Sequence, residues 1–208
     1  MNKPLESNKL LFASNNKGKI KEIQAFASKL AIEILSPQDL GISIEVVEDG
    51  RTFIENATKK AQAYLPLVDE SFYVIGDDSG IEIPALGGEP GVYTRRWAGY
   101  EMTDQEIVKY CLEKMRHLSG EDRKATFKTV LALGRGSDDF QYFEGQLDGV
   151  ITEQPDVRPI QPGMPFRNIF LIPEVNKMLL DINDPGVNVI SHRQKALKKI
   201  VDYLAEEF

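Results

Sequence analysis

The chain has few cysteines, few histidines and no long hydrophobic run. Its 208 residues include one cysteine, Cys111, so no intramolecular disulfide can form. The apolar runs are far shorter than the ~20 residues that span a bilayer, and the first residues lack the apolar core of a secretion signal. We therefore expect a cytoplasmic protein with no membrane partner, in which Cys111 is a buried small side chain and not a nucleophile.

An excess of positive charge is missing as well. The sequence has 25 Lys and Arg against 32 Asp and Glu, a formal net charge of −7. Proteins that bind duplex nucleic acid usually carry a basic footprint, so the composition argues against a nucleic-acid partner. Small anions remain compatible with this charge, because helix N-termini, a few lysines or a metal ion can hold phosphate. The Gly-x-Ser-x-Gly motif of serine hydrolases is absent too.

Alternating helical and strand patterns are present, and they predict an α/β fold with a mixed sheet. Apolar residues recur at helical spacing in residues 20–30, 51–65, 103–118 and 191–208. Strand patterns occupy residues 9–13, 32–35, 72–76, 80–86, 125–134, 139–152 and 168–173. The meander over 125–152 argues against a purely parallel sheet. We expect a single domain over residues 1–208, with the meander in a second lobe and a cleft between the lobes.

Two adjacent aspartates, Asp77 and Asp78, follow the predicted strand 72–76. If the strand ends there in a turn, both carboxylates can converge on one divalent cation, whose charge outweighs their repulsion. A carboxylate that stays free of the metal can serve as a general base on a bound water. The alternative is ordinary turn chemistry of the Asp-Ser-Gly sequence, and the segment alone does not decide between the two.

Two other segments carry polar residues immediately before a predicted helix. The stretch Ser-Asn-Asn-Lys-Gly-Lys can present backbone N–H groups to an anion, with Lys17 and Lys19 adding charge, or it can simply cap the helix. Glu48 and Asp49 are either metal ligands or loop acids placed favourably before a helix N-terminus.

The last predicted helix begins with Ser191, His192 and Arg193. These side chains suit hydrogen bonding to a planar polar ligand such as a nucleobase. Alternatively, Ser191 is only a helix cap and His192 only a structural histidine.

Four segments together resemble the inosine triphosphate pyrophosphatase family, also called the Ham1 or non-standard purine nucleoside triphosphatase family. In order they are FASNNKGKIKEI, DGRTFIENATKKA, GDDSGIEIPALGGEPGVYTRRWAG and ISHRQKAL. The resemblance covers nearly the whole chain. It implies an elongated mixed α/β fold with two lobes, a Mg²⁺-filled cleft and usually a homodimer. It also implies hydrolysis of ITP, dITP and XTP to the monophosphate and pyrophosphate, which cleanses the nucleotide pool.

Position by position, the resemblance assigns roles to individual residues. Glu48 and Asp77 would bind Mg²⁺. Asp78 would orient or deprotonate the attacking water, and Lys19 would share in catalysis. The substrate contacts would be those that hold the triphosphate (Ser14, Asn16, Lys19), shape the turn (Ser79, Gly80) and reach the purine (Phe166, His192, Arg193).

One segment departs from the family pattern. Members usually carry a stretch close to GFGYDPIF before the last helix, where this chain has GMPFRNIF. Phe166 can supply the stacking aromatic ring, but Arg167 replaces an aspartate, Asn168 replaces a proline, and a usual lysine falls near Val187. These changes lie on the base-recognition side. Two alternatives therefore stay open: the same chemistry on a different or modified nucleotide, and a nucleotide-binding protein that no longer hydrolyses.

Overall fold

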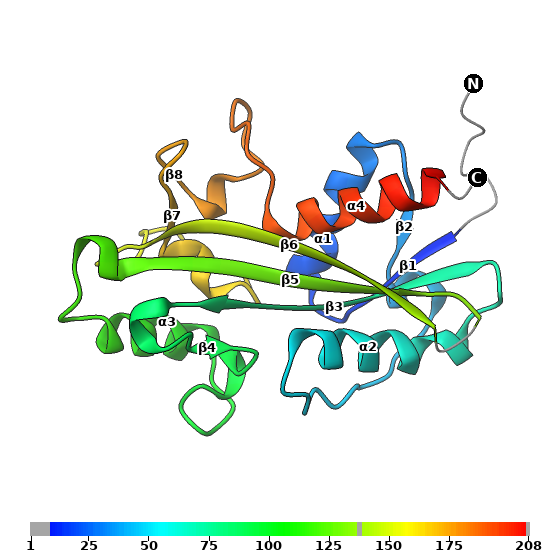
Figure 1. Cartoon of the computed structure of the whole chain (residues 1–208), viewed down its shortest axis with the longest axis horizontal. Helices are drawn as coiled ribbons and strands as arrows, with labels where there is room; N and C mark the ends of the chain where they lie inside the picture. The colour runs from blue at the N-terminus through cyan, green and yellow to red at the C-terminus, as the bar shows by residue number, and fades with distance from the viewer. Residues whose placement is uncertain (1–8, 137–138, 207–208) are drawn as a thin grey trace. The chain divides into compact units, whose positions relative to one another are not determined.

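The computed structural model describes residues 9–136 and 139–206, which form a mixed sheet and the helices that cover it (Figure 1). The strands are β1 (Lys9–Ala13), β2 (Ile34–Leu35), β3 (Phe72–Glu82), β4 (Pro90–Gly91), β5 (Lys124–Gly134), β6 (Phe140–Ile151), β7 (Phe170–Ile172) and β8 (Lys177–Met178). The α-helices are α1 (Lys17–Lys29), α2 (Phe53–Tyr64), α3 (Asp104–Lys114) and α4 (His192–Glu206).

The strand order in the sheet is β2-β1-β3-β5-β6-β7-β8, and β4 pairs with β3. β1 pairs in parallel with both β2 and β3. The pairs β3–β4, β6–β7 and β7–β8 are antiparallel. The predicted mixed sheet is therefore confirmed. The turn expected between β5 and β6 lies partly outside the described residues.

The chain divides into two compact units, each with an apolar core of its own. The first takes in residues up to 79, 129–145 and those from 192 onward; here α1 and α4 cover one face of the sheet and α2 covers the other (Figure 1). Its core includes Leu11, Ala57, Tyr64, Val74 and Val130. The second unit comprises 80–128 and 146–191, and its core includes Ile81, Ile107, Met115, Ile151 and Phe170.

Local hydrogen bonds explain where the helices begin. The Thr52 side chain accepts from the Glu55 backbone N (3.1 Å) and so caps the N-terminus of α2. Thr103 and Glu106 form a reciprocal capping box at the start of α3. Cys111 is fully buried in the same helix, and burial raises the pKa of its thiol to about 12, as expected for an inert side chain.

β3 is longer than the sequence pattern predicts. We expected a strand over 72–76, a turn, and another strand from Gly80; the structure has one continuous strand from Phe72 to Glu82. The predicted turn is wrong because polar side chains from neighbouring helices and strands satisfy Asp77, Asp78 and Ser79 within the sheet. The two acids consequently lie in the middle of a strand.

Two glycines let helices approach the sheet closely. A Cβ on Gly76 would lie 2.0 Å from the Ala57 carbonyl oxygen on α2, and one on Gly145 would lie 1.8 Å from the His192 carbonyl oxygen on α4. Both positions therefore require glycine, and the polar side chains of α2 are brought within reach of β3.

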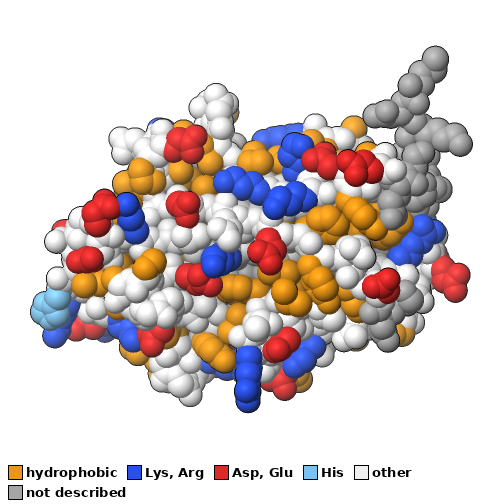
Figure 2. Space-filling view, viewed as in Figure 1, with side chains coloured by type: hydrophobic (Ala, Val, Ile, Leu, Met, Phe, Trp, Pro, Cys, Tyr) orange, Lys and Arg blue, Asp and Glu red, His pale blue; other side chains and the backbone are white. Residues whose placement is uncertain are grey.

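Acidic and basic side chains are interspersed on the face shown in Figure 2. None of the helices in residues 9–136 and 139–206 is long and apolar enough to cross a membrane.

Candidate active site

The segment after β1 caps the N-terminus of α1. Asn16 Oδ1 accepts hydrogen bonds from the backbone N of Gly18 (3.0 Å) and of Lys19 (3.1 Å). The Ser14 hydroxyl accepts one from the backbone N of Asn16 (3.2 Å). The helix N-terminus has partial positive charge and Lys19 adds a full charge, so this corner of the first unit favours an anion such as phosphate.

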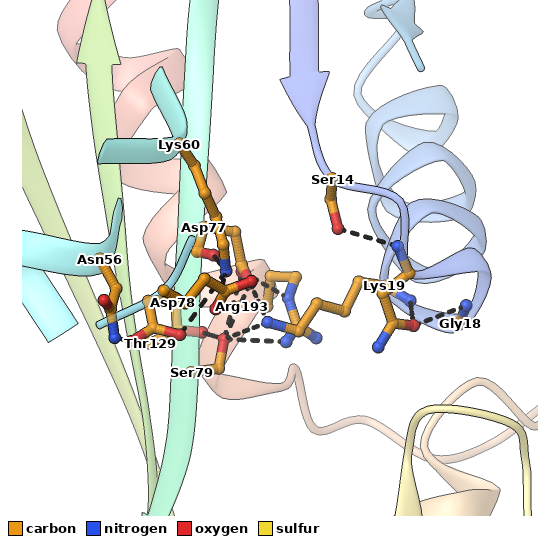
Figure 3. A network of polar contacts seen from close by, with 12 residues as sticks. Ser14, Gly18, Lys19, Asn56, Lys60, Asp77, Asp78, Ser79, Thr129 and Arg193 are labelled. Atoms are coloured by element: carbon orange, nitrogen blue, oxygen red, sulfur yellow. Dashed lines mark hydrogen bonds and ion pairs between the residues drawn. The ribbon is translucent and has the colours of Figure 1, made fainter. Parts of the chain in front are cut away.

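Strand alternation sends the polar residues of β3 to two different faces. Asp77 and Ser79 face α1 and α4, whereas Gly76 and Asp78 face α2. Lys19 reaches the strand from α1, and Asn56 reaches it from α2 (Figure 3). The expectation that the two adjacent carboxylates converge on one point is therefore wrong, and each has its own set of partners.

Asp77 belongs to a buried ionic cluster. The Nε atom of Arg193 donates to Asp77 Oδ2 (2.8 Å), and Lys19 Nζ forms an ion pair with Oδ1. Other nitrogens of Arg193 donate to Ser79 Oγ (2.9 Å) and to Glu22 Oε2 (2.7 Å). Burial alone would raise the pKa of Asp77, but the charges of Arg193 and Lys19 outweigh it and hold that pKa far below its usual range. Burial also lowers the pKa of Lys19, although Asp77 opposes this.

Asp78 has a different environment. Asn56 Nδ2 donates to Asp78 Oδ2 (3.0 Å), and Lys60 Nζ lies 3.7 Å from Oδ1. Asn56 and Lys60 are four residues apart on α2 and so share one helix face. The Asn56 Oδ1 atom accepts from the backbone N of Gly50 (2.8 Å). Burial raises the pKa of Asp78 above its usual range, and Lys60, Lys19 and Asn56 only partly offset it.

Glu48 lies in a segment, residues 42–50, that has no helix or strand. Lys60 Nζ lies 2.6 Å from Glu48 Oε2 and also donates to the Asp77 backbone carbonyl (2.8 Å). The carboxylates of Glu48 and Asp78 therefore share one cation, whereas the Asp77 carboxylate does not reach it. In the part of the chain that the structure describes, no group of three or more acidic, histidine or cysteine side chains could hold a metal.

Two of the residues expected to contact a purine begin α4. His192 and Arg193 are both buried, and Arg193 directs its guanidinium into the cluster with Asp77. The structure thus brings Arg193 together with the predicted phosphate-binding Lys19 and Ser79. Contact with a purine stays a prediction for both residues.

The segment that departs from the family pattern lies in the second unit. Phe166 is 3% exposed and packs against Trp97 and Phe127, with ring centroids 6.4 Å and 6.1 Å away. Arg167 is also buried, and its Nη1 donates to Gln161 Oε1 (3.1 Å). Stacking of Phe166 on a base stays a prediction, and in this structure neighbouring rings cover that side chain.

Several polar residues of the site were not singled out from the sequence. Asn56 and Lys60 hold Asp78, Glu22 pairs with Arg193, and the Thr129 hydroxyl forms a hydrogen bond with that of Ser79. For Glu22 and Asn56 the sequence does contain a signal, namely a polar residue within the buried part of an amphipathic helix. Glu22 is buried together with Ile23, and Asn56 is buried together with Ala57. Thr129 offers no such signal, because threonine is common in strands.

Comparison with known proteins decides the family. The model of the Ham1 family matches residues 10–203. The chain belongs to the Ham1 family. This Ham1 chain is 39% identical over 194 residues to the dITP/XTP pyrophosphatase of Leuconostoc mesenteroides, covering 92% of this chain and 94% of that protein. It is 37% identical over 198 residues to the dITP/XTP pyrophosphatase of Thermus thermophilus, covering 95% and 92% respectively.

Solved structures of Ham1 proteins share the fold. The Ham1 protein of Staphylococcus aureus gives a TM-score of 0.75 at 29% identity and covers 97% of this chain and 100% of that one. The HAM1 protein of Coxiella burnetii gives a TM-score of 0.75 at 29% identity, covering 96% and 99%. The resemblance and the mixed α/β fold class inferred from the sequence are both confirmed.

Proposed function

We propose that this Ham1 protein hydrolyses the triphosphates of deaminated purines, namely ITP, dITP and XTP, to the monophosphate and pyrophosphate. Water would attack the α-phosphorus, the bond from that phosphorus to the α–β bridging oxygen would break, and pyrophosphate would leave. The names of the relatives, dITP/XTP pyrophosphatases at 39% and 37% identity over nearly the whole chain, support this reaction.

The observation that carries the proposal is the environment of Asp78. This carboxylate is buried, its pKa is raised, and polar groups of α2 hold both of its oxygens in place. A raised pKa makes an aspartate a better proton acceptor, provided it is ionised at the working pH. Asp78 would take the proton of the attacking water, as the resemblance implies.

We propose Mg²⁺ as the cofactor, held by Glu48 together with the substrate phosphates, while Asp78 faces the same position and stays free of the metal to accept the proton. These two carboxylates already flank a single cation, the Lys60 ammonium, so they converge on one cation position. Binding of Mg²⁺ by Asp77, which the family resemblance implies, stays a prediction; in this structure Lys19 and Arg193 pair with that carboxylate. Mg²⁺ is often bound by one or two carboxylates together with substrate phosphates, and it would neutralise phosphate charge here.

The phosphates themselves would lie at the N-terminus of α1. Ser14, Asn16 and Lys19 are there, and Lys19 also approaches Ser79 Oγ (3.5 Å). Positioning and charge stabilisation supply most of the catalysis in phosphoryl transfer, and this arrangement provides both. Formation of a homodimer stays a prediction that light scattering on the purified protein would check.

A different or modified nucleotide is the second candidate substrate. Arg167, a buried cation next to Gln161, occupies the position where the family resemblance expects an acid. A reversed charge there would favour a base edge rich in acceptors. The third candidate, a nucleotide-binding protein without turnover, is less well supported because Lys19, Glu48 and Asp78 are all present.

A substrate panel tests the proposal. The protein is incubated with Mg²⁺ and ITP, dITP, XTP, GTP, ATP or pyrimidine triphosphates, and pyrophosphate release is measured. We expect release chiefly from ITP, dITP and XTP. Absence of release from every nucleotide would overturn the enzyme assignment, and release mainly from a standard nucleotide would overturn the proposed role in pool cleansing.

A further inference from the structure

Glu22 is a buried carboxylate to which the proposed reaction gives no part. It lies on α1, three residues after Lys19, and is 3% exposed among the apolar residues of that helix face. A carboxylate out of contact with water is costly unless a charged group pairs with it. The Glu22 Oε2 atom accepts from Arg193 Nη1 at 2.7 Å, and Arg193 is 171 positions further along the chain. The pair therefore joins α1 to α4 inside the first unit.

The guanidinium of Arg193 is held at three points. Nη1 donates to Glu22, Nε donates to Asp77, and Nη2 donates to Ser79. The group is planar and rigid, so a contact that fixes one edge also fixes the directions of the other nitrogens. Glu22 supplies the contact on the edge turned away from β3.

We infer that Glu22 is a positioning residue that orients Arg193 toward Asp77 and Ser79, an inference that rests on the proposed function. The ionic cluster contains two acids, Glu22 and Asp77, and two cations, Arg193 and Lys19. Without the charge of Glu22, Asp77 would be the one acid of this cluster left to pair with both cations. The guanidinium could then turn about its stem and compete with Lys19 for the Asp77 carboxylate, which would disturb the lysine proposed to hold phosphate.

Glu22→Gln tests the inference, since it removes the charge but retains an oxygen that can accept from Arg193. We expect kcat for ITP to fall about 10- to 100-fold, the usual effect of misplacing groups in a site. KM for ITP should not rise. Lys19 remains to bind the triphosphate, and the loss of the negative charge of Glu22 makes the ionic cluster more attractive to that anion. Glu22→Ala, which also loses the acceptor, should lower kcat further. A purely structural role would instead lower the unfolding midpoint and leave kcat of the folded fraction unchanged.

Asp181→Asn is the matched control. Asp181 is a buried acid that pairs with an arginine, Arg158 Nη1 at 2.5 Å, in the second unit and outside the ionic cluster. Its loss should leave kcat unchanged and lower stability by less than the loss of Glu22, because the Arg158 side chain is 46% exposed. An equal loss of kcat in this control would contradict the inference, since any broken buried pair would then have the same effect.

A double-mutant cycle decides whether Glu22 acts through Arg193. In an Arg193→Met background, adding Glu22→Gln should lower kcat by less than about two-fold, because the group that Glu22 positions is gone. If the double variant instead shows the product of the two kcat losses measured for the single variants, the inference is overturned. Wild-type protein assayed in parallel separates the two claims: no pyrophosphate release overturns the proposed function, whereas release combined with multiplying losses overturns only the role of Glu22.

Discussion

Asp77 and Asp78 are neighbours in the sequence, yet their carboxylates have different partners and opposite pKa shifts. Arg193 and Lys19 keep Asp77 ionised in a fully buried place. Burial, only partly offset by Lys60, raises the pKa of Asp78. Groups whose environments push their pKa values apart usually have different tasks. Asp77 stabilises the folded site, and Asp78 is the proton acceptor that we propose.

Asp78→Asn should lower kcat by about 100- to 10 000-fold, because an amide cannot accept the proton of the attacking water. Binding of the nucleotide should persist, since the proposed phosphate contacts on α1 remain. Steady-state kinetics and calorimetry would measure the two effects. Asp49→Asn is the matched control: Asp49 lies in the neighbouring loop and pairs with the exposed Lys59. Near-normal turnover in the Asp78 variant would remove this residue from its role.

Asp77→Asn should lower the free energy of unfolding by about 3 kcal/mol at neutral pH, because Arg193 and Lys19 lose a buried partner. The folded-state pKa of Asp77 lies below its unfolded value of about 4, so its contribution is present above pH 4 and is lost as the pH falls further. Urea unfolding between pH 7 and pH 3 would measure this. Below pH 4 the free energy of unfolding should fall less in the variant than in the wild type. An equal fall in both proteins would contradict the lowered pKa of Asp77.

At the scale of elements, the site depends on the close packing of α2 against β3. Asn56 and Lys60 reach Asp78 only because α2 lies directly over Gly76, where a side chain would meet the helix backbone. The same helix holds the loop before it, through the bond from the Gly50 backbone N to Asn56. Helix, strand and loop thus fix Glu48 and Asp78 near one cation.

Gly76→Ala should disturb stability and turnover together. Its Cβ would lie 2.0 Å from the Ala57 carbonyl oxygen and 2.8 Å from the Ala61 backbone N, so α2 must shift away from the strand. We expect a loss of about 3 kcal/mol, at the upper end for overpacking, and a fall in kcat. Gly41→Ala is the control: its φ of +67° costs about 1 kcal/mol as alanine, but no atom lies within 4 Å. Unchanged kcat in the Gly76 variant would contradict the packing argument.

The sequence predicted the elements well where their periodicity is local. The apolar spacing that predicts α1 and α4 depends on residues within a few positions of each other, and both helices are observed. The continuity of β3 could not be predicted, because Asp77 and Ser79 stay in the strand through contacts with Arg193, more than 110 positions away. The pairing of Glu22 could not be predicted for the same reason, since Arg193 is 171 positions away from it.

At the scale of the whole molecule, family membership joins these observations into one account. Residues 10–203 match the Ham1 family. The described site residues of the first unit come from β3, β5, α1, α2, α4, the segment between β1 and α1, and the loop before α2. The segments that depart from the pattern, around Arg167, are in the second unit. The site residues therefore support the type of reaction more strongly than they support a preference for a particular base.

The position of water attack tests the central claim most directly. The protein is incubated with ITP and Mg²⁺ in ¹⁸O-labelled water, and mass spectrometry measures which product carries the label. Our account predicts one ¹⁸O atom in the inosine monophosphate and none in the pyrophosphate, because water attacks the α-phosphorus. Label in pyrophosphate, or formation of inosine diphosphate with labelled orthophosphate, would contradict it.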